Sequence, residues 1–226
     1  MKYTGDIVST DANNSFMMDE RFIKCYEEVK KTDTRGYLGN QDIRWRIHTI
    51  LWAAKLALKN EGDFVDCGGG FGYFMSSIYS YFDFENIDKK YYMLDSFQGM
   101  DLSTSSKEEI HGHNSSFAKI GSWHEDVVKN HSNKKNLKII QGYLPGTLSE
   151  VDVDKISFLS IDLNSVKPEV ECLNILWDRV IKGGAIVLDD YGFPGCEKQK
   201  LAHDEFAKSK DCIIMASPTG QGILIK

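Results

Sequence analysis

From residue 63 onwards, the sequence alternates between short apolar runs rich in β-forming residues and longer segments with helical periodicity. Such alternation is typical of parallel strands joined by crossover helices. The strands that we expect are Asp63–Cys67, Tyr91–Asp95, Leu137–Gln141, Ile156–Asp162 and Ala185–Asp189. The helix before the last of these is expected to begin at Ser165 and Pro168 and to end at Gly183–Gly184. The chain is therefore predicted to form an α/β fold with a doubly wound sheet.

The end of the sequence departs from this alternation. The apolar runs Cys212–Ala216 and Gly222–Ile225 are separated by a turn too short for a crossover helix, so they are expected to pair as an antiparallel hairpin. A mostly parallel, seven-stranded sheet closed by a hairpin resembles the Rossmann-like sheet of class I methyltransferases. A nicotinamide-binding domain normally finishes with parallel strands instead.

The segment before the first strand, residues 1–62, is expected to form a flexible arm over residues 1–15 followed by two helices. Apolar spacing predicts one helix around Phe22–Val29 and another after a cap at Asn40–Asp42. We expect this segment to lie on the substrate side of a cofactor-binding domain formed by residues 63–226. A chain of 226 residues has room for a single core, so both parts should form one globular unit.

Composition excludes several classes of function. A net charge of −6 gives no electrostatic reason to bind nucleic acid or an anionic membrane, so a small-molecule acceptor is expected. The five cysteines form no C-x-x-C pair, which argues against a disulfide framework or a zinc knuckle. The longest apolar-rich stretch, Ile50 to Leu58, is interrupted by Lys55 and is too short to span a bilayer. We expect a cytoplasmic protein, with a homo-oligomer left open.

A glycine-rich loop follows the first predicted parallel strand. Residues 66–72 read D-C-G-G-G-F-G, and glycine allows a tight turn and a close approach of a ligand to the backbone. The dinucleotide fingerprint G-x-G-x-x-G fails here, because Tyr73 or Met75 would occupy its third glycine position. Methyltransferase loops instead hold the amino-acid end of S-adenosylmethionine with an acidic residue and backbone amides. The candidate cofactor residues are Asp66, Gly68, Gly70 and Gly72, although a tight turn that binds nothing would look similar.

Asp95 ends the second predicted strand of the sheet, where open α/β folds hydrogen-bond ribose hydroxyls. We therefore expect Asp95 to bind the cofactor ribose, with Ser96 as a further cofactor contact. The alternative is that Asp95 caps the segment that follows it.

Three further carboxylates end neighbouring strands. Asp162 follows the fourth strand, whereas Asp189 and Asp190 follow the fifth, and ligands collect at this edge of such sheets. Crowded carboxylates repel one another unless a cation lies between them, and oxygen ligands suit Mg²⁺. A metal would acidify a substrate hydroxyl and orient it for transfer. Alternatively, these are separate loop carboxylates that face water.

Five segments occur in an order that is familiar from one enzyme family. They are D-C-G-G-G-F-G, Y-M-L-D-S-F-Q-G-M, Q-G-Y-L-P-G-T-L, S-I-D-L-N and G-G-A-I-V-L-D-D-Y-G. Over roughly Arg44 to Lys208 the chain resembles the macrocin O-methyltransferase (TylF-like) family, which methylates sugar hydroxyls of natural products and typically depends on Mg²⁺. The resemblance implies that Asp162, Asp189 and Asp190 are metal ligands, with Asp162 also beside the cofactor and the reaction. It also implies a ribose role for Asp95 and an adenine-side contact for Ser122.

The chain departs from the family at the position that commonly supplies a second aspartate, sometimes assigned as the general base. Asn164 stands there, which leaves the base unidentified. His111 and His113, in the long polar loop from Ser96 to Gly121, and His124 beyond it could each accept a hydroxyl proton near neutral pH. Solvated histidines without a catalytic role are the alternative. Ser122 also forms an S-x-x-E capping box with Glu125, which would explain it structurally.

Three other functions are compatible with parts of this pattern. A catechol-type O-methyltransferase shares the fold and the acidic Mg²⁺ site. A non-catalytic cofactor-binding or scaffolding subunit would need neither metal nor base. A nicotinamide oxidoreductase is the third, although the loop spacing disfavours it.

Overall fold

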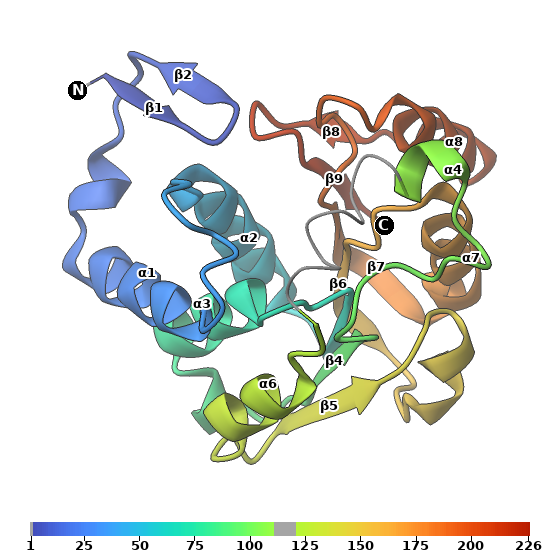
Figure 1. Ribbon diagram of the computed structural model, residues 1–226, viewed down its shortest axis with the longest axis horizontal. Coiled ribbons are helices and arrows are strands. Elements are labelled where there is room, and N and C mark those ends of the chain that lie inside the picture. Colours follow the sequence, from blue (N-terminus) through green and yellow to red (C-terminus); the bar gives the residue numbers. More distant parts are fainter. Residues whose placement is uncertain (1, 111–120) are drawn as a thin grey trace.

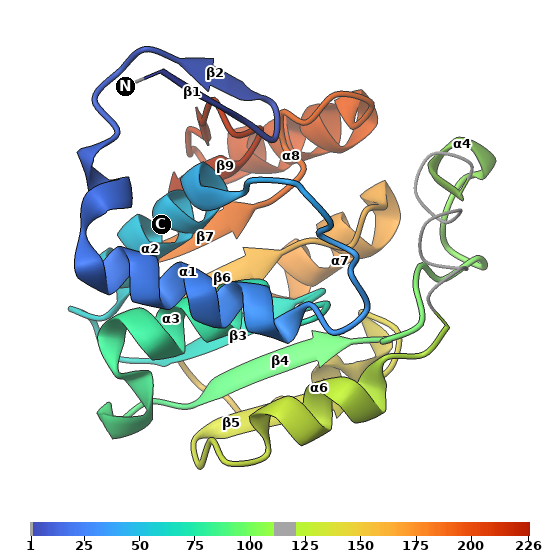
Figure 2. The same cartoon turned by 60° about the vertical axis from the view of Figure 1, so that its left-hand side comes forward.

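The computed structural model of the chain describes residues 2–110 and 121–226. Within them, seven strands form one sheet in the order β5-β4-β3-β6-β7-β9-β8 (Figures 1 and 2). The strands are β3 (Asp63–Cys67), β4 (Tyr91–Asp95), β5 (Leu137–Gln141), β6 (Ile156–Ile161), β7 (Val180–Leu188), β8 (Met215–Ala216) and β9 (Gly222–Ile225). β3 to β7 are parallel, whereas β9 is antiparallel to both β7 and β8. This arrangement confirms the expected sheet and its C-terminal hairpin.

Helices cover both faces of the sheet. The first face carries α1 (Glu20–Thr32), α2 (Arg44–Ala57) and α3 (Tyr73–Phe82), and the second carries α7 (Val166–Leu176) and α8 (Glu197–Ser209), as Figure 2 shows. α6 (His124–His131) lies beside β5. The single turn α4 (Lys107–Glu109) lies outside both helical layers, and its Glu108 pairs with Lys198 of α8 at 3.7 Å. The 3₁₀ turns are η1 (Ser15–Met18), η2 (Phe84–Asn86), η4 (Gly146–Glu150) and η5 (Trp177–Arg179). No helix in these ranges is long and apolar enough to cross a membrane.

Alternation along the strands builds two hydrophobic cores. Successive side chains of a strand point to opposite faces, so Phe64 packs with α2 and α3, whereas Val65 packs with α7. β4 repeats the pattern with Met93 on the first face and Leu94 on the second. The strands are apolar on both sides because both faces are covered.

The N-terminal arm is not the flexible segment that its polarity predicted. β1 (Tyr3–Gly5) and β2 (Val8–Thr10) form an antiparallel hairpin, in which Tyr3 and Val8 are buried. The Tyr3 hydroxyl donates to the backbone carbonyl of Asp42, 2.8 Å away, just before α2. These two buried side chains and the hydrogen bond hold the hairpin against the segment before α2. Two apolar residues in an otherwise polar stretch were too weak a signal to predict the hairpin.

Two element boundaries also differ from the predictions. Gly183 and Gly184 lie inside β7 instead of ending α7, at a point where the pairing with β6 shifts register. Strands tolerate glycine at such irregularities. Gly183 and Gly184 therefore indicate a distorted stretch of strand and not the end of a helix. β8 is shorter than expected, because the backbone N–H of Cys212 still bonds to the carbonyl of Ala207 at the end of α8.

The cap predicted for α2 is one residue out of place. The N-cap is Ile43, whose side chain makes no capping bond. Asp42 nevertheless accepts the backbone N–H of Arg44, 3.1 Å away, and so satisfies one donor of the first turn.

Candidate active site

One cavity of about 350 Å³ opens at the carboxyl ends of the parallel strands. It lies where the chain order in the sheet reverses, since β4 and β5 lie on one side of β3 and β6 lies on the other. Open α/β sheets bind ligands at this switch point. The cavity is lined by the glycine-rich loop, the ends of β4, β6 and β7, the segment before α2, and the hairpin residue Asp6.

The glycine-rich loop forms the floor of the cavity. The backbone N–H groups of Gly68 and Gly69 donate to the carbonyl of Leu94, at 2.7 and 3.1 Å, which folds the loop back over β4. Gly68, Gly69 and Gly70 line the cavity. Gly72 instead caps α3 in the left-handed region, and a Cβ there would meet His131 at 3.1 Å. The loop therefore exposes its first three glycines and uses the fourth to start the helix.

Asp95 lines this cavity next to the glycine-rich loop. Its Oδ2 accepts the backbone N–H of Gly70 at 2.8 Å, and its Oδ1 accepts that of Phe97 at 2.6 Å. Burial raises its pKa, and these two bonds oppose the rise. Ser96 also lines the cavity, with its hydroxyl donating to the carbonyl of Gly99. Asp95 thus fixes the glycine-rich loop and leaves lone pairs for a ligand.

Asp66 is placed differently from Asp95. It is buried beneath the loop and does not line the cavity. Its carboxyl accepts hydroxyl donors from Tyr91 at 3.1 Å and Ser160 at 2.9 Å, and burial raises its pKa to about 7. A direct ligand contact was expected of this acid, whereas its contacts make it a support of β3, β4 and β6.

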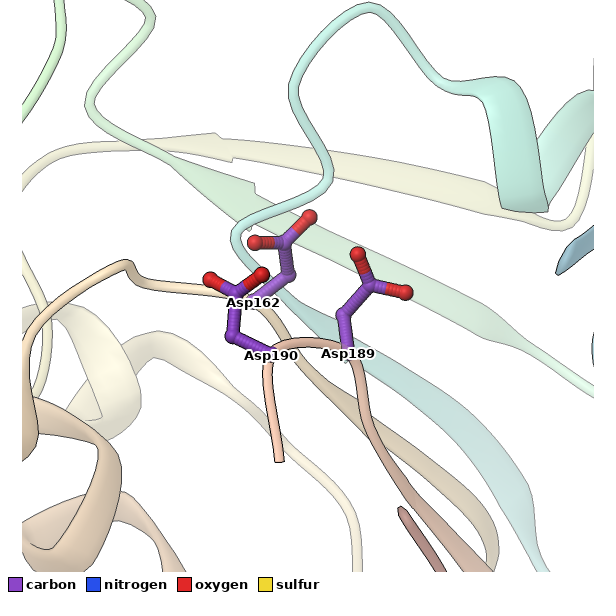
Figure 3. A group of neighbouring side chains, drawn as sticks. All are labelled: Asp162, Asp189 and Asp190. Carbon is purple, nitrogen blue, oxygen red and sulfur yellow. The ribbon is translucent and has the colours of Figure 1, made fainter. Parts of the chain in front are cut away.

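The three remaining acids converge. Asp162, Asp189 and Asp190 each offer a carboxylate oxygen, and these oxygens all lie within 4.8 Å of one another. Figure 3 shows the three carboxyl groups beside one another at the ends of β6 and β7. All three residues line the cavity. The cluster predicted from the strand ends is therefore present as a geometric unit.

The surroundings of the cluster suit a cation. Burial and the neighbouring carboxylates raise the pKa of Asp162 and bring that of Asp190 to about 8, because crowding disfavours the charged forms. Asp190 Oδ2 is buried without a hydrogen-bond partner. An orphaned carboxylate oxygen beside two other acids is the donor arrangement that a hard divalent ion satisfies.

Asn164 orients one of these acids. It adopts the left-handed region at φ 57°, and its Nδ2 donates to Asp162 Oδ1 at 3.0 Å. Behind it, the backbone N–H of Leu163 donates to the buried Glu169 at 3.2 Å. An amide cannot accept a proton as a carboxylate does, so Asn164 holds Asp162 in place without serving as a base.

The capping box predicted at Ser122 and Glu125 does not form. The N-cap of α6 is Trp123, without a side-chain capping bond, and Ser122 is exposed outside the cavity lining. Its neighbour Trp123 lines the cavity, stacks on Phe71 and donates from its indole to the carbonyl of Gly70. A capping box forms in α4 instead, between Ser106 and Glu109.

Of the three histidines proposed as bases, His124 lies within the described residues. His111 and His113 lie outside those residues. His124 packs its ring against Phe97, with 5.0 Å between centroids, and does not line the cavity.

Several cavity residues carried no sequence motif. Arg46 on α2, Asp6 on the hairpin, Tyr37 before α2 and Phe193 after β7 all line the cavity. Arg46, Asp6 and Tyr37 lie within residues 1–62, for which the sequence predicted only a flexible arm and two helices. Arg46 could have been noticed as a charged residue on the buried stripe of a helix, where an unpaired charge is costly.

Comparison with known families decides which family the chain belongs to. The model of one family, Macrocin-O-methyltransferase (TylF), matches residues 45–215. The chain belongs to this family. It is therefore an S-adenosylmethionine-dependent methyltransferase, and membership in the TylF family sets aside the nicotinamide oxidoreductase. No curated protein matches the chain.

Solved structures with the same fold include other methyltransferases. The O-methyltransferase NovP is 20% identical with a TM-score of 0.71, covering 95% of this chain and 99% of NovP. The calicheamicin methyltransferase CalS11 is 12% identical with a TM-score of 0.63, covering 95% and 94%. TomG from Streptomyces achromogenes, an O-methyltransferase of tomaymycin synthesis solved with SAM, is 13% identical with a TM-score of 0.54, covering 94% and 93%. These likenesses confirm the class I methyltransferase fold of this TylF family member.

Proposed function

We propose that this TylF family member transfers the methyl group of S-adenosylmethionine to a hydroxyl of a sugar or a glycosylated natural product, with Mg²⁺ assistance. The observation that carries the proposal is the convergence of Asp162, Asp189 and Asp190 in the cavity that the glycine-rich loop and Asp95 also line. In this proposal the cofactor and the acceptor hydroxyl occupy adjacent parts of one cavity. A sugar acceptor is further supported by CalS11, described as a TDP-rhamnose 3'-O-methyltransferase.

On the cofactor side, we place the amino-acid end of S-adenosylmethionine at Gly68 to Gly70 and its ribose at Asp95. Gly70 leaves open space where a Cβ would project, and Asp95 is held in position by two backbone donors. Trp123 closes this side through its contact with the loop. Asp66 would act indirectly, by holding the loop from beneath.

On the acidic side, the fit to a divalent ion rests on the donor set. Asp162 is oriented by Asn164, and Asp190 has an orphaned buried oxygen. When bound there, Mg²⁺ would lower the pKa of an acceptor hydroxyl. The carboxylates would hold that hydroxyl in line with the methyl group. Asn164 stands where the family commonly has an aspartate that could act as the base. The proton of the acceptor hydroxyl would therefore pass to solvent water or to a histidine of the loop that precedes α6.

The segment before β3 belongs to the same unit in this proposal. α1 and α2 pack on α3, and α2 also packs on β6 and β7. Several residues between Tyr37 and Arg46 contribute to the cavity wall. We assign residues 1–62 to the acceptor side and residues 63–226 to the cofactor-binding side.

The test measures methyl transfer from labelled S-adenosylmethionine to a panel of glycosides, with a catechol as the alternative acceptor. Transfer to a glycoside that stops in EDTA and returns with Mg²⁺ is the expected result. Asp190→Asn should lower the rate by about a hundredfold or more, whereas the exposed Asp88→Asn should not change it. Transfer to the catechol alone would favour the catechol-type alternative. Full activity in EDTA would show that the reaction does not depend on a metal.

A further inference from the structure

A buried arginine contacts the acidic cluster from the side of α2. Arg46 Nη1 donates to Asp189 Oδ2, and the opposite oxygen of Asp189 accepts from Gln221 Nε2 at 2.8 Å. Both Arg46 and Gln221 are buried. Asp189 is thus held at both oxygens, whereas Asp190 retains an oxygen without a partner.

The same guanidinium reaches the N-terminal hairpin. Its Nη2 and Nε donate to Asp6 Oδ2, at 2.9 and 3.2 Å, and its Cζ lies 5.3 Å from the centre of the Phe193 ring. Asp6 is about 11% exposed, so this ion pair is largely shielded from solvent. The hairpin also meets the β8–β9 turn, where a Cβ on Gly220 would lie 3.2 Å from Ile7 (Figures 1 and 2). A segment outside the family match therefore forms part of the cavity wall.

The charges in this arrangement have a direct consequence for a cation in the cluster. Arg46 places a positive charge beside Asp189, which weakens the attraction of the cluster for a second cation. Asp6 offsets that charge, so the Asp6–Arg46 pair is nearly neutral as seen from the cluster. Removing either partner leaves an uncompensated charge of opposite sign at the same place.

We propose that Arg46 is a positioning residue of the methyl-transfer site, which fixes the Asp189 carboxylate and sets the affinity of the acidic cluster for Mg²⁺, with Asp6 balancing its charge. The inference rests on the Mg²⁺ site of the proposed function. It adds that the N-terminal hairpin acts on that site through a single side chain. Neither Asp6 nor Arg46 needs to touch the metal or the acceptor for this effect.

The experiment is calorimetry of MgCl₂ binding to the full-length protein without cofactor. Arg46→Gln should tighten Mg²⁺ binding by about tenfold, because a positive charge beside the cluster is lost. Asp6→Asn should weaken it by about tenfold, because the arginine charge is no longer offset. The asparagine keeps an acceptor for Arg46, so its effect isolates the charge.

Matched controls come from a neighbouring ion pair at the start of the same helix. Arg44 pairs with Asp42 at 2.5 Å, and neither residue lines the cavity. Arg44→Gln and Asp42→Asn should leave Mg²⁺ binding within about twofold of the parent protein, since their charges lie outside the site.

The outcomes separate this inference from the proposed function. Shifts of opposite sign in Arg46→Gln and Asp6→Asn support it, because a general distortion of the fold would weaken binding in both. If the parent protein binds Mg²⁺ and the affinities of the two variants equal that of the parent or change in the same direction, the proposed role of Arg46 is wrong. The metal site of the proposed function would then stand. If the parent protein binds no Mg²⁺, the metal site itself is wrong and the inference fails with it. Should Arg46→Gln not fold, Asp6→Asn is compared with its matched control Asp42→Asn. Weakening in Asp6→Asn alone supports the inference, and equal weakening in both variants contradicts it.

Discussion

A Cβ atom on Gly68 would lie 1.8 Å from the backbone carbonyl oxygen of Asp162. The backbone N–H of Asp162 in turn donates to the carbonyl of Cys67 at 2.9 Å. The glycine-rich loop and the first acid of the cluster are therefore in backbone contact. The glycine-rich side and the acidic side of the cavity are positioned by the same pair of strand ends, β3 and β6.

This contact predicts different effects for two neighbouring glycines. Gly68→Ala should lower the melting temperature by about 10 °C or prevent folding, because no side-chain motion relieves a clash with backbone. Gly70→Ala has open space and a φ of +53°, so it should cost only about 1–2 kcal/mol of stability. Its methyl group nevertheless enters the cavity, and S-adenosylhomocysteine binding should weaken at least about tenfold. Thermal melts and calorimetry of both variants check this, and equal stability of the two would contradict it.

Asp95→Asn should weaken S-adenosylhomocysteine binding by about 10- to 100-fold. The substitution replaces a carboxylate, which has two accepting oxygens, by an amide that has one. The backbone N–H groups of Gly70 and Phe97 already use both carboxylate oxygens, so the amide has less capacity left to accept from a ligand. Asp101→Asn is the control, because Asp101 lines the same cavity from the loop beyond Gly99. Affinity lost equally in both variants would indicate a general charge effect and remove Asp95 as a specific ligand.

The sequence predicted the parts of the molecule that repeat a regular pattern. Strand residues such as Phe64 and Val65 alternate between two covered faces, and the short connection before Gly222 excludes a crossover. The acids at strand ends were predictable for the same reason, because the carboxyl ends of parallel strands share one edge. These inferences need only local sequence and known topology.

The remaining contacts join segments far apart in the chain, which local patterns do not encode. Arg46 meets Asp189 across 143 positions and Asp6 across 40, and neither pairing leaves a periodic signal. Ser122 matched a local motif, but helix α6 starts one residue later because Trp123 packs on the glycine-rich loop. Tertiary packing overrode the capping preference there.

Removal of residues 222–226 should unfold the protein. β9 lies between β7 and β8, and its Ile223 and Leu224 are buried. Losing each of these side chains costs about 1.5–3 kcal/mol, and the exposed edge of β7 loses its hydrogen-bond partner as well. Circular dichroism and urea unfolding of the truncated chain provide the measurement, with Lys226→Ala as a control that keeps the strand. Native melting of the truncated chain would contradict the inserted position of β9.

Asp66→Asn should change how stability depends on pH. Burial raises the pKa of Asp66 to about 7, so between about pH 4 and pH 7 the folded protein holds a proton that the unfolded chain releases. The folded state then binds more protons than the unfolded state, and the free energy of unfolding falls as pH rises through this range, by up to about 4 kcal/mol from this group. Asparagine has the same size and does not ionise, so the variant should lack this loss.

Urea unfolding at pH 4.5, 6.0 and 8.0 and constant ionic strength gives the measurement. The stability of Asp66→Asn relative to the parent should increase from pH 4.5 to pH 8.0, because every other titrating group is common to both proteins. Asp88→Asn, which changes an exposed carboxylate, should follow the parent at all three values. If the difference between Asp66→Asn and the parent is constant across the range, Asp66 is ionised throughout in the folded protein. The hydroxyls of Tyr91 and Ser160 would then stabilise the charged carboxylate more than burial destabilises it.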